Sequence, residues 1–529
     1  MSDQRRTTPL DRRRFLTLAG GGGLVAATST VTGFATIPAN ASAFPDDPFR
    51  LGVASGDPRP DGVVLWTRLA PDPLAPDGRA GMSPRTVPVQ WQIAEDPRFR
   101  HVVRAGTERA SADLAHSVHA EVDGLQPGRD YWYRFRAGRE VSPVGHTRTA
   151  PAAGAALSSM TFAFASCQNY PAGYFNAYRH MADEDLDLVV HLGDYIYEGT
   201  AQGSLGRGHL PTVECRSLAD YRIRYGQYKS DPDLQAAHAA FPWVVVLDDH
   251  EVDNNWADEV DGHGAGGPEF LARRAAALQA YYENMPLRRS SMPSGYDMQL
   301  YRRLTYGNLA QLNVVDSRQY RDDQACGDGR RFDCEERLDP SRTLLGTEQE
   351  SWLLDGLGGS PTTWNVMANQ IFMMQADSAY GPEQAFGMDT WDGYAAARSR
   401  LFTGIQERGV QNFVVLTGDA HRSVASDLTV DFDDPESRAV GTEFLGTSIS
   451  SGGDGQDTDD WGRRWLAENP HMKFHNVQRG YARCVVTQDE WRTDYRVVPY
   501  VTERGAPIRT RASVYVEAGR AGIQDVSEG

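Results

Sequence analysis

Four apolar stretches of this chain each end on residue types that bind metal ions, and this recurrence constrains the fold more than any other feature. The stretches are residues 160–167 (MTFAFASC), 186–198 (LDLVVHLGDYIYE), 243–251 (WVVVLDDHE) and 413–422 (FVVLTGDAHR). Short runs rich in Val and Leu predict buried strands. In open α/β sheets, ligands bind just beyond the carboxyl ends of the strands. We therefore expect the four strand ends to meet and to form one site for two metal ions.

The side chains at these strand ends divide into two kinds of donor. Asp249 and Asp419 offer hard oxygen atoms, which favour Ca²⁺, Mg²⁺ or Mn²⁺. A second set combines a thiolate, a phenolate, a carboxylate and an imidazole, and this electron-rich mixture suits Fe³⁺ better than Mg²⁺ or Ca²⁺. The members of the second set are Cys167, Tyr197, Asp194 and His421. Asp194 lies between the two sets and is the expected bridging carboxylate. Two cations ~3.5–4 Å apart stabilise the attacking and the leaving oxygen of an in-line displacement.

Each assignment has a plainer alternative. A buried free cysteine usually only packs, and a tyrosine at a strand end is usually structural. The strand-end position of Cys167 and the spacing of Tyr197 from Asp194 favour ligands, whereas Tyr195 is interpreted as structural. His250 is interpreted as a donor to the transition state rather than as a ligand.

The first 43 residues resemble a twin-arginine export signal. Three consecutive arginines, Arg12 to Arg14, precede a Gly-rich apolar run, and Ala41 and Ala43 form a small-x-small cleavage site. The apolar run is shorter than the ~20 residues that a spanning helix needs, and no later segment has the character of a membrane span. We therefore expect transport by the twin-arginine translocase to the cell exterior, the periplasm or the cell wall.

The net charge narrows the possible binding partners. The chain carries a net charge of −18, which disfavours nucleic acid as a stable partner. A small anionic substrate then needs a strong local positive charge, which metal ions supply.

Cys326 and Cys334 are close enough in sequence to close a disulfide loop after export. The sequence leaves open whether Cys215 pairs with Cys484. We expect the protein to be a monomer.

The order of patterns along the chain predicts two domains. Residues 44–150 show the alternation of half-buried strands, and the segment GLQPGRDYWYRFRAG at 124–138 resembles the late hairpin of a fibronectin-type (Ig-like) β-sandwich. A small Ala-rich linker is expected at 151–159. Strands then alternate with helices over 160–510, which predicts a layered α/β domain. Expected helices include one spanning residues 218–240, and residues 511–529 are expected to form an exposed C-terminal tail.

Five motifs in order resemble the PhoD-type alkaline phosphatases of the calcineurin-like metallophosphoesterase superfamily, to which the purple acid phosphatases are related. The motifs are FASCQNY, LGDYIYE, LDDHEVDNNW, DSRQYR and GDAHRS. Within the superfamily pattern, Cys167 replaces an aspartate, Asp249 an asparagine and Asp419 a histidine, a combination typical of the PhoD type. The resemblance covers the chain from the leader to about residue 500.

This resemblance implies a four-layer α/β-sandwich catalytic domain after the N-terminal sandwich, with Fe³⁺ and one or two Ca²⁺ as cofactors. It also implies hydrolysis of phosphate monoesters and diesters, with Asp194 and His250 at the reacting group and release of phosphate. Asn254 and Arg422 are the tentative substrate contacts, with helix capping and a salt bridge as their respective alternatives. Two other functions stay open: a phospholipase-D-like phosphodiesterase on the same scaffold, and a secreted binding protein without catalysis.

Overall fold

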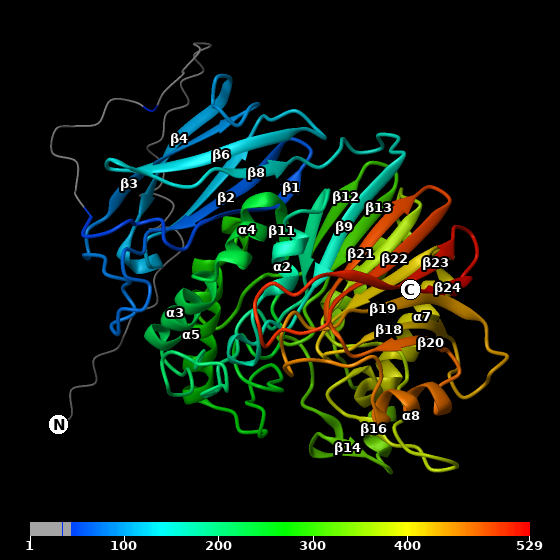
Figure 1. Ribbon diagram of the computed structural model, residues 1–529. Coiled ribbons are helices and arrows are strands. Elements are labelled where there is room, and N and C mark those ends of the chain that lie inside the picture. Colours follow the sequence, from blue (N-terminus) through cyan, green and yellow to red (C-terminus); the bar gives the residue numbers. More distant parts are fainter. Residues whose placement is uncertain (1–33, 35–43) are drawn as a thin grey trace, which may run out of the picture.

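The computed structural model describes residue 34 and residues 44–529 (Figure 1). Apart from residue 34, the predicted export signal, with Arg12 and Arg13, lies outside the described residues. Among the helices that are described, none is long and apolar enough to cross a bilayer.

The largest element of the fold is a ten-stranded mixed sheet. Its strands, in spatial order, are β24 (Asp525–Glu528), β23 (Arg509–Glu517), β22 (Glu490–Val498), β21 (Arg479–Thr487), β9 (Ser159–Ala165), β10 (Leu188–His191), β11 (Pro242–Val245), β1 (Val53–Arg59), β2 (Gly62–Arg68) and β5 (Ser117–Asp123). The four central strands, β9, β10, β11 and β1, are parallel, and the strands on both sides of them pair antiparallel. Three of the predicted metal-binding stretches therefore leave the same edge of this sheet.

A second, seven-stranded sheet faces the first. Its strands, in spatial order, are β12 (Arg302–Tyr306), β13 (Ala310–Val314), β15 (Trp364–Ala368), β17 (Phe413–Thr417), β19 (Ala439–Leu445), β18 (Ser423–Thr429) and β20 (Met472–Asn476). One continuous apolar core contains buried side chains of both sheets, among them Phe164, Leu312 and Phe444. This packing brings the end of β17, which carries the fourth stretch, to the strand ends of the first sheet.

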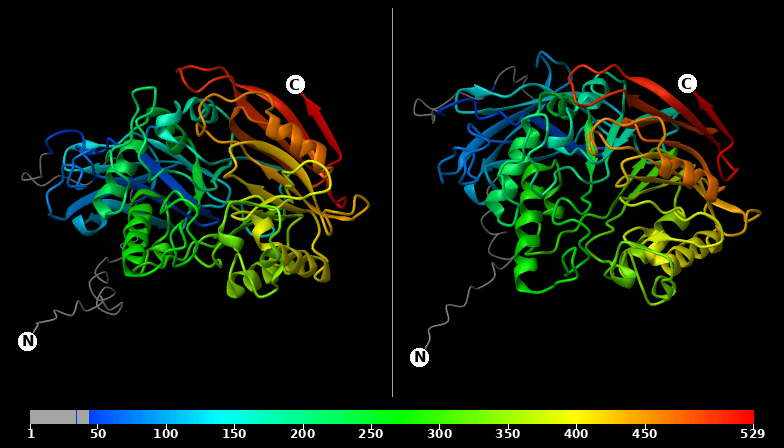
Figure 2. Two further views of the ribbon diagram at one scale, coloured as in Figure 1. Left: turned by 90° about the horizontal axis from the view of Figure 1, so that it is seen from below. Right: turned by 60° about the horizontal axis from the view of Figure 1, so that its bottom comes forward.

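Helices cover the outer faces of the two sheets (Figures 1 and 2). They are α2 (Asn176–Met181), α3 (Leu218–Lys229), α4 (Pro232–Ala240), α5 (Pro268–Asn284), α6 (Thr347–Gly358), α7 (Ala395–Glu407) and α8 (Asp460–Glu468). The prediction of one helix over residues 218–240 is wrong. Pro232 lacks an amide donor and starts a new helix, and the Asp231 carboxylate caps it by accepting from the amides of Asp233 and Leu234.

The N-terminal region is not separate from the first sheet. A third sheet contains β4 (Val102–Ala110), β3 (Val87–Ala94), β6 (Asp130–Ala137), β7 (Glu140–Val141) and β8 (Gly145–Arg148). It packs on β1, β2 and β5 through a shared core that includes Val63, Leu65, Ile93 and Tyr133. Because β1 also pairs with β11 in parallel, the N-terminal strands continue the sheet that carries three of the predicted metal-binding stretches.

The predicted exposed tail at 511–529 is also wrong. The expected boundary falls inside β23, which pairs with β22, and β24 then adds a further strand at the edge of the sheet. Buried Ala512, Val514 and Val516 pack into the main core. The alternation of apolar and polar residues at 512–516 is the strand signal that identifies this segment.

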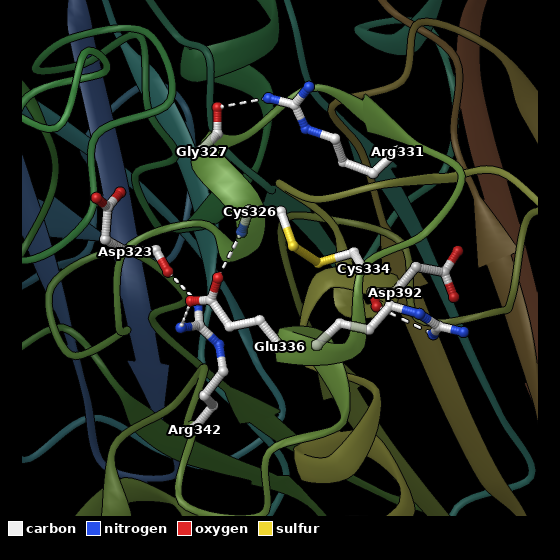
Figure 3. Close-up of a disulfide and its surroundings, with 9 residues drawn as sticks. Asp323, Cys326, Gly327, Arg331, Cys334, Glu336, Arg342 and Asp392 are labelled. Atoms are coloured by element: carbon white, nitrogen blue, oxygen red, sulfur yellow. Dashed lines mark hydrogen bonds and ion pairs between the residues drawn. A yellow bond between two sulfur atoms is a disulfide. The ribbon is translucent and has the colours of Figure 1, made fainter.

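The predicted disulfide between Cys326 and Cys334 is present (Figure 3). It closes a surface loop near the two-stranded pair of β14 (Arg330–Arg331) and β16 (Phe386–Gly387). Cys167, Cys215 and Cys484 are buried free thiols, so the open pairing of Cys215 with Cys484 is not made.

Candidate metal centre

The four predicted strand ends meet at one place in the structure. Cys167 follows β9, Asp194 follows β10, and Asp249 and His250 follow β11 in the ten-stranded sheet. Asp419 and His421 follow β17 of the other sheet. A parallel bridge between Ser166 and Ser448 links the two sheets directly beside the site.

The donor residues occupy strained turns. Cys167, Asp194, Asp419 and His421 all have φ between 55° and 63°, the left-handed region that non-glycine residues rarely adopt. Such conformations persist only where the surrounding structure enforces them, and they cluster at functional sites. Gly193 has φ 106°, and a Cβ there would lie 2.3 Å from the Cβ of Asp248. Close approach of the two turns therefore requires glycine at this position.

A buried glutamate holds two of these turns together. The Glu251 carboxylate accepts hydrogen bonds from the backbone amides of Asp194 (3.1 Å), Tyr195 (2.5 Å) and Asp248 (2.8 Å). The amide of Cys167 in turn donates to the carbonyl of Gly193 (3.2 Å). The turns after β9, β10 and β11 are thus tied into one rigid frame.

The first donor set converges as predicted from the sequence. Ligand atoms of Cys167, Asp194 and His421 all lie within 4.8 Å of one another. The Tyr197 hydroxyl donates to Asp194 Oδ2 (2.9 Å) and lies 3.1 Å from Nε2 of His421. Ser451 Oγ donates to the same phenol oxygen at 2.7 Å. A thiol, a carboxylate, an imidazole and a phenol therefore surround one point.

The second donor set contains one carboxylate more than the sequence predicts. Asp248, Asp249 and Asp419 have ligand atoms within 4.8 Å of one another. The buried guanidinium of Arg318 donates to Asp248 Oδ1 (2.6 Å) and lies 3.9 Å from Asp249 Oδ2. The other side of this guanidinium forms a bidentate pair with Asp389 (2.9 and 2.9 Å). Asp248 is thus both a potential ligand and the anchor of Arg318.

Asp194 connects the two sets. Its carboxylate also forms a cluster with Asp249 and His250, within the same 4.8 Å limit. Asp194 is 1% exposed, and its Oδ1 has no hydrogen-bond partner in the structure. A buried carboxylate oxygen without a partner costs free energy, and a cation between the two sets would remove that cost.

The electrostatics of the site favour bound cations. Burial, followed by neighbouring carboxylates, raises the pKa values of Cys167, Asp194 and Asp419 well above their usual ranges. Burial likewise raises the pKa of Asp248 to about 7, although Arg318 opposes the shift. A positive charge nearby would favour the ionised forms of these groups. Both donor sets therefore fit metal ions, which would keep the acids ionised.

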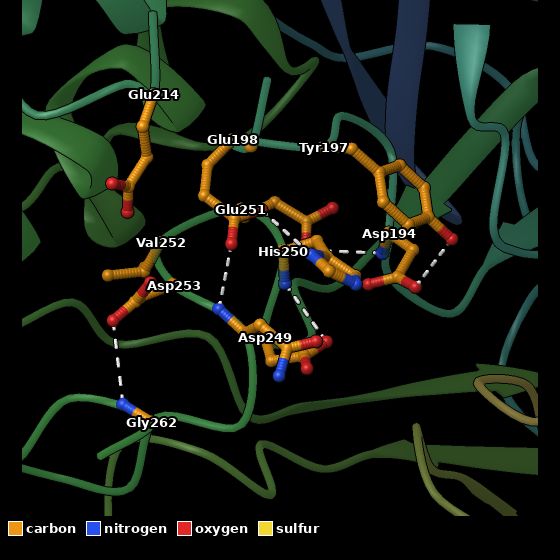
Figure 4. Close-up of polar contacts among 12 residues, drawn as sticks. Asp194, Tyr197, Glu198, Glu214, Asp249, His250, Glu251, Val252, Asp253 and Gly262 are labelled. Carbon is orange, nitrogen blue, oxygen red and sulfur yellow. Dashed lines mark hydrogen bonds and ion pairs between the residues drawn. The ribbon is translucent and has the colours of Figure 1, made fainter. Parts of the chain in front are cut away.

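His250 is held beside the centre by a second buried glutamate (Figure 4). Glu198 Oε2 lies 2.7 Å from His250 Nδ1, and its Oε1 accepts from the amide of Asn254 at 2.9 Å. The imidazole lies against the Tyr197 ring, with centroids 4.1 Å apart. Although burial opposes it, the charges of Glu198, Asp249 and Asp194 raise the pKa of His250 well above its usual value. The neighbouring carboxylates thus favour the protonated form of the ring.

The two tentative substrate contacts lie at the margin of the centre. The side chain of Asn254 is exposed, and only its backbone amide reaches Glu198. Arg422 Nη1 lies 3.4 Å from Nε2 of His475 and 3.7 Å from Asp459. Tyr195 is directed elsewhere, because its hydroxyl lies 2.7 Å from Nε2 of His238 in the core.

Sequence reasoning left Glu198, Asp248, Glu251 and Arg318 without a role at the site. All four lie inside motifs that were recognised, but no ligand pattern marks them. Each of them is a charged residue within a few positions of the end of a buried strand, where an unpaired charge would be unfavourable. This position is the sequence signal that they share.

Comparisons with known proteins agree along most of the chain. Residues 162–495 match the family model "PhoD-like phosphatase", and residues 35–151 match "PhoD-like phosphatase, N-terminal domain". The chain is similar to alkaline phosphatase D of Bacillus subtilis (strain 168), with 53% identity over 523 residues. That match covers 98% of this chain and 89% of the relative.

A solved structure shows the same likeness. A structure described as "Structure of PhoD" is 54% identical, covers 92% of this chain and 94% of its own, and has a TM-score of 0.90. The GAP50 anchor in the inner membrane complex of Plasmodium covers 70% of this chain and 90% of its own. Its identity of 10% and TM-score of 0.36 are too low to bear on this chain.

Proposed function

The chain belongs to the PhoD-like phosphatase family and is a phosphoric ester hydrolase, and we propose that it hydrolyses small phosphate monoesters and diesters. We further propose that its cofactors are one Fe³⁺ and one or two Ca²⁺. For the fold, we propose a fibronectin-like N-terminal sandwich and a four-layer catalytic domain, which the three sheets and their cores support.

The observation that carries the cofactor proposal is the position of Asp194 between two chemically different donor sets. On one side lie a thiol, a phenol and an imidazole, which suit ferric iron. On the other side lie the carboxylates of Asp248, Asp249 and Asp419, which suit calcium. One carboxylate oxygen of Asp194 accepts a hydrogen bond from Tyr197, and the other has no hydrogen-bond partner. This is expected of a carboxylate that bridges two ions.

The residues would have the following roles as metal ligands. Cys167, Tyr197 and His421 would hold iron, Asp249 and Asp419 would hold calcium, and Asp194 would bridge, with Asp248 as an additional calcium ligand. When bound, the two cations would neutralise the charge of the substrate phosphate and act as Lewis acids.

The protein side chains would complete the reaction. His250, kept protonated by Glu198, would donate a hydrogen bond to the negative charge that develops on phosphate or on the leaving oxygen. Asn254 and Arg422, at the margin of the centre, would orient the remainder of the substrate.

Selective chelation tests the two-metal assignment. Treating the pure enzyme with EGTA should abolish hydrolysis of nitrophenyl phosphate and of its bis-ester, because calcium bound by carboxylates exchanges readily. The visible absorption from tyrosinate-bound iron should remain, and added Ca²⁺ should restore turnover. A sample given excess Ca²⁺ before EGTA is the control. Loss of iron together with calcium would contradict the two-metal assignment.

We also propose that the enzyme is exported by the twin-arginine pathway, on the basis of the arginines and cleavage site in residues 1–43. Changing both Arg12 and Arg13 to lysine should retain the precursor in the cytoplasm, which cell fractionation would measure. The matched control changes Arg5 and Arg6, which precede the motif. Normal export of the first variant would exclude this route.

A further inference from the structure

A serine-rich loop of the second sheet lies against the thiol-containing donor set. This serine loop, residues 446–453 (GTSISSGG), directly follows β19. The carbonyl of Cys167 accepts hydrogen bonds from the backbone amides of Ser450 (3.4 Å) and Ser451 (3.3 Å). The loop therefore holds the turn that carries the thiol, although it comes from the opposite sheet.

The serine loop also reaches two other donors of the same set. Arg479 Nη1 donates to Ser448 Oγ (3.1 Å) and to the carbonyl of His421 (2.6 Å), and so joins the loop to the turn of the imidazole. Ser451 Oγ lies 2.7 Å from the phenol oxygen of Tyr197. Directly or through Arg479, the loop thus contacts three of the four residues proposed to hold iron.

The Ser451 hydroxyl is the point where the loop meets a donor atom itself. Ser451 is 1% exposed, and its Oγ accepts from the amide of Asn169 at 3.0 Å. Two acceptors are within reach of its proton, the phenol oxygen of Tyr197 (2.7 Å) and the carbonyl of Cys167 (2.8 Å). A serine hydroxyl has a single proton, so it can serve only one of them at a time.

Ionisation of Tyr197 decides between the two acceptors. The other neighbours of the phenol oxygen are Asp194 Oδ2 (2.9 Å) and His421 Nε2 (3.1 Å), and Figure 4 shows the first. An ionised carboxylate only accepts, and an imidazole nitrogen that binds a metal ion has no proton. Among the described residues, Ser451 is then the one neighbour of this oxygen with a proton to donate. A charged acceptor is preferred to a carbonyl, and the Cys167 carbonyl keeps its two amide donors.

We propose that Ser451 is a positioning residue of the iron site, whose hydroxyl donates to the phenolate oxygen of Tyr197, fixes that ligand and limits its donor strength. The inference rests on the proposed bond between Tyr197 and Fe³⁺ and deepens it. Hydrogen bonds to ligand atoms orient them and tune the electronic properties of the metal. A phenolate that shares its electrons with Ser451 gives less of them to the metal and leaves it a stronger Lewis acid.

Ser451→Ala tests the inference through the colour of the holoenzyme. Loss of the hydrogen bond raises the energy of the phenolate electrons, so the charge-transfer band should move to longer wavelength. The ferric form gains a stronger donor, and the reduction potential of the iron should become more negative. Visible spectra at equal iron content and a potentiometric titration would measure both. We expect kcat to fall by about 10–10²-fold and KM to stay unchanged, because Ser451 is buried.

Ser450→Ala is the matched control. Ser450 is buried in the same loop, and its hydroxyl donates to the carbonyl of Asn169 (2.8 Å) rather than to a metal donor. This variant should keep the wild-type band and potential. Ser451→Thr retains a hydroxyl group and should return the band towards its wild-type position.

A measurement on the wild-type enzyme decides the matter if Ser451→Ala fails to fold. The tyrosinate vibrations in the resonance Raman spectrum should shift between H₂O and D₂O, because the proton donated by Ser451 exchanges. Absence of this isotope shift, or an unmoved band in Ser451→Ala, would overturn the proposal, since the hydroxyl would then serve the Cys167 carbonyl. Equal band shifts in Ser451→Ala and Ser450→Ala would also overturn it, because distortion of the loop would explain both. A wild-type enzyme without iron or colour would instead contradict the proposed cofactor, and this inference with it.

Discussion

Replacing His250 with alanine is expected to lower kcat by roughly 10²–10⁴-fold while both kinds of metal ion stay bound. The reason is the geometry of the ring: Nδ1 is held by Glu198 at 2.7 Å, and the side chain keeps 21% of its surface exposed. Nε2 is therefore the nitrogen left to reach a substrate oxygen. Steady-state kinetics and elemental analysis of the same preparation would check the result. Loss of metal from the variant would instead identify His250 as a ligand.

Glu198→Gln is the companion variant. Glu198 is the largest favourable influence that raises the pKa of His250, so its removal should lower that pKa. A donor with a lower pKa loses its proton at lower pH, and the alkaline limb of the pH–rate profile should move towards acid. The glutamine side chain would still hold the His250 ring but would carry no charge, so kcat should fall by about 10–10²-fold. An unchanged profile would show that Glu198 only supports the Asn254 loop.

Asp194→Ala is expected to reduce hydrolysis to the uncatalysed background. Asp194 clusters with Cys167 and His421 on one side and with Asp249 of the carboxylate set on the other, so its loss should empty both sets. Elemental analysis should find neither iron nor calcium in stoichiometric amount, and the visible colour should disappear.

Two single-set variants serve as matched comparisons for Asp194→Ala. Cys167→Ala should lower iron occupancy without rescue by added Ca²⁺. Asp419→Ala should keep the colour and lose calcium. If Asp194→Ala keeps either ion at full occupancy, or if the two comparison variants exchange their effects, the division of ligands is wrong.

The sequence contained the positions of the donor residues but not the frame that holds them. Cys167 and Asp194 could be predicted to meet because each follows an apolar run, and strand ends of a parallel sheet share an edge. His421 joins them from the other sheet, which the strand pattern alone does not place. The role of Glu251 could not be predicted, because its three partners are backbone amides of turns that come together only in the folded chain. The same holds for Arg318, whose carboxylate partners lie about 70 residues away on both sides.

The errors in the fold prediction have a similar cause. The pairing of β1 with β11 joins segments almost two hundred residues apart, and local alternation identifies a strand without identifying its neighbour. The segment at 511–529, predicted to be a tail, lies beyond the motifs. Its alternating pattern nevertheless marks it as a strand, and only the tertiary structure shows that β22 is its partner.

The pairing of β9 with β21 determines when this protein can fold during its synthesis. β9 ends at residue 165, and its neighbour β21 ends at Thr487. At 5–20 residues per second, a ribosome needs roughly 15 s to a minute to make the roughly 320 residues between them. For that time one side of β9 exposes unpaired backbone groups, which invite pairing with other chains. A chain shortened before β21 would keep this side of β9 unpaired, and we expect it to aggregate rather than yield a smaller enzyme.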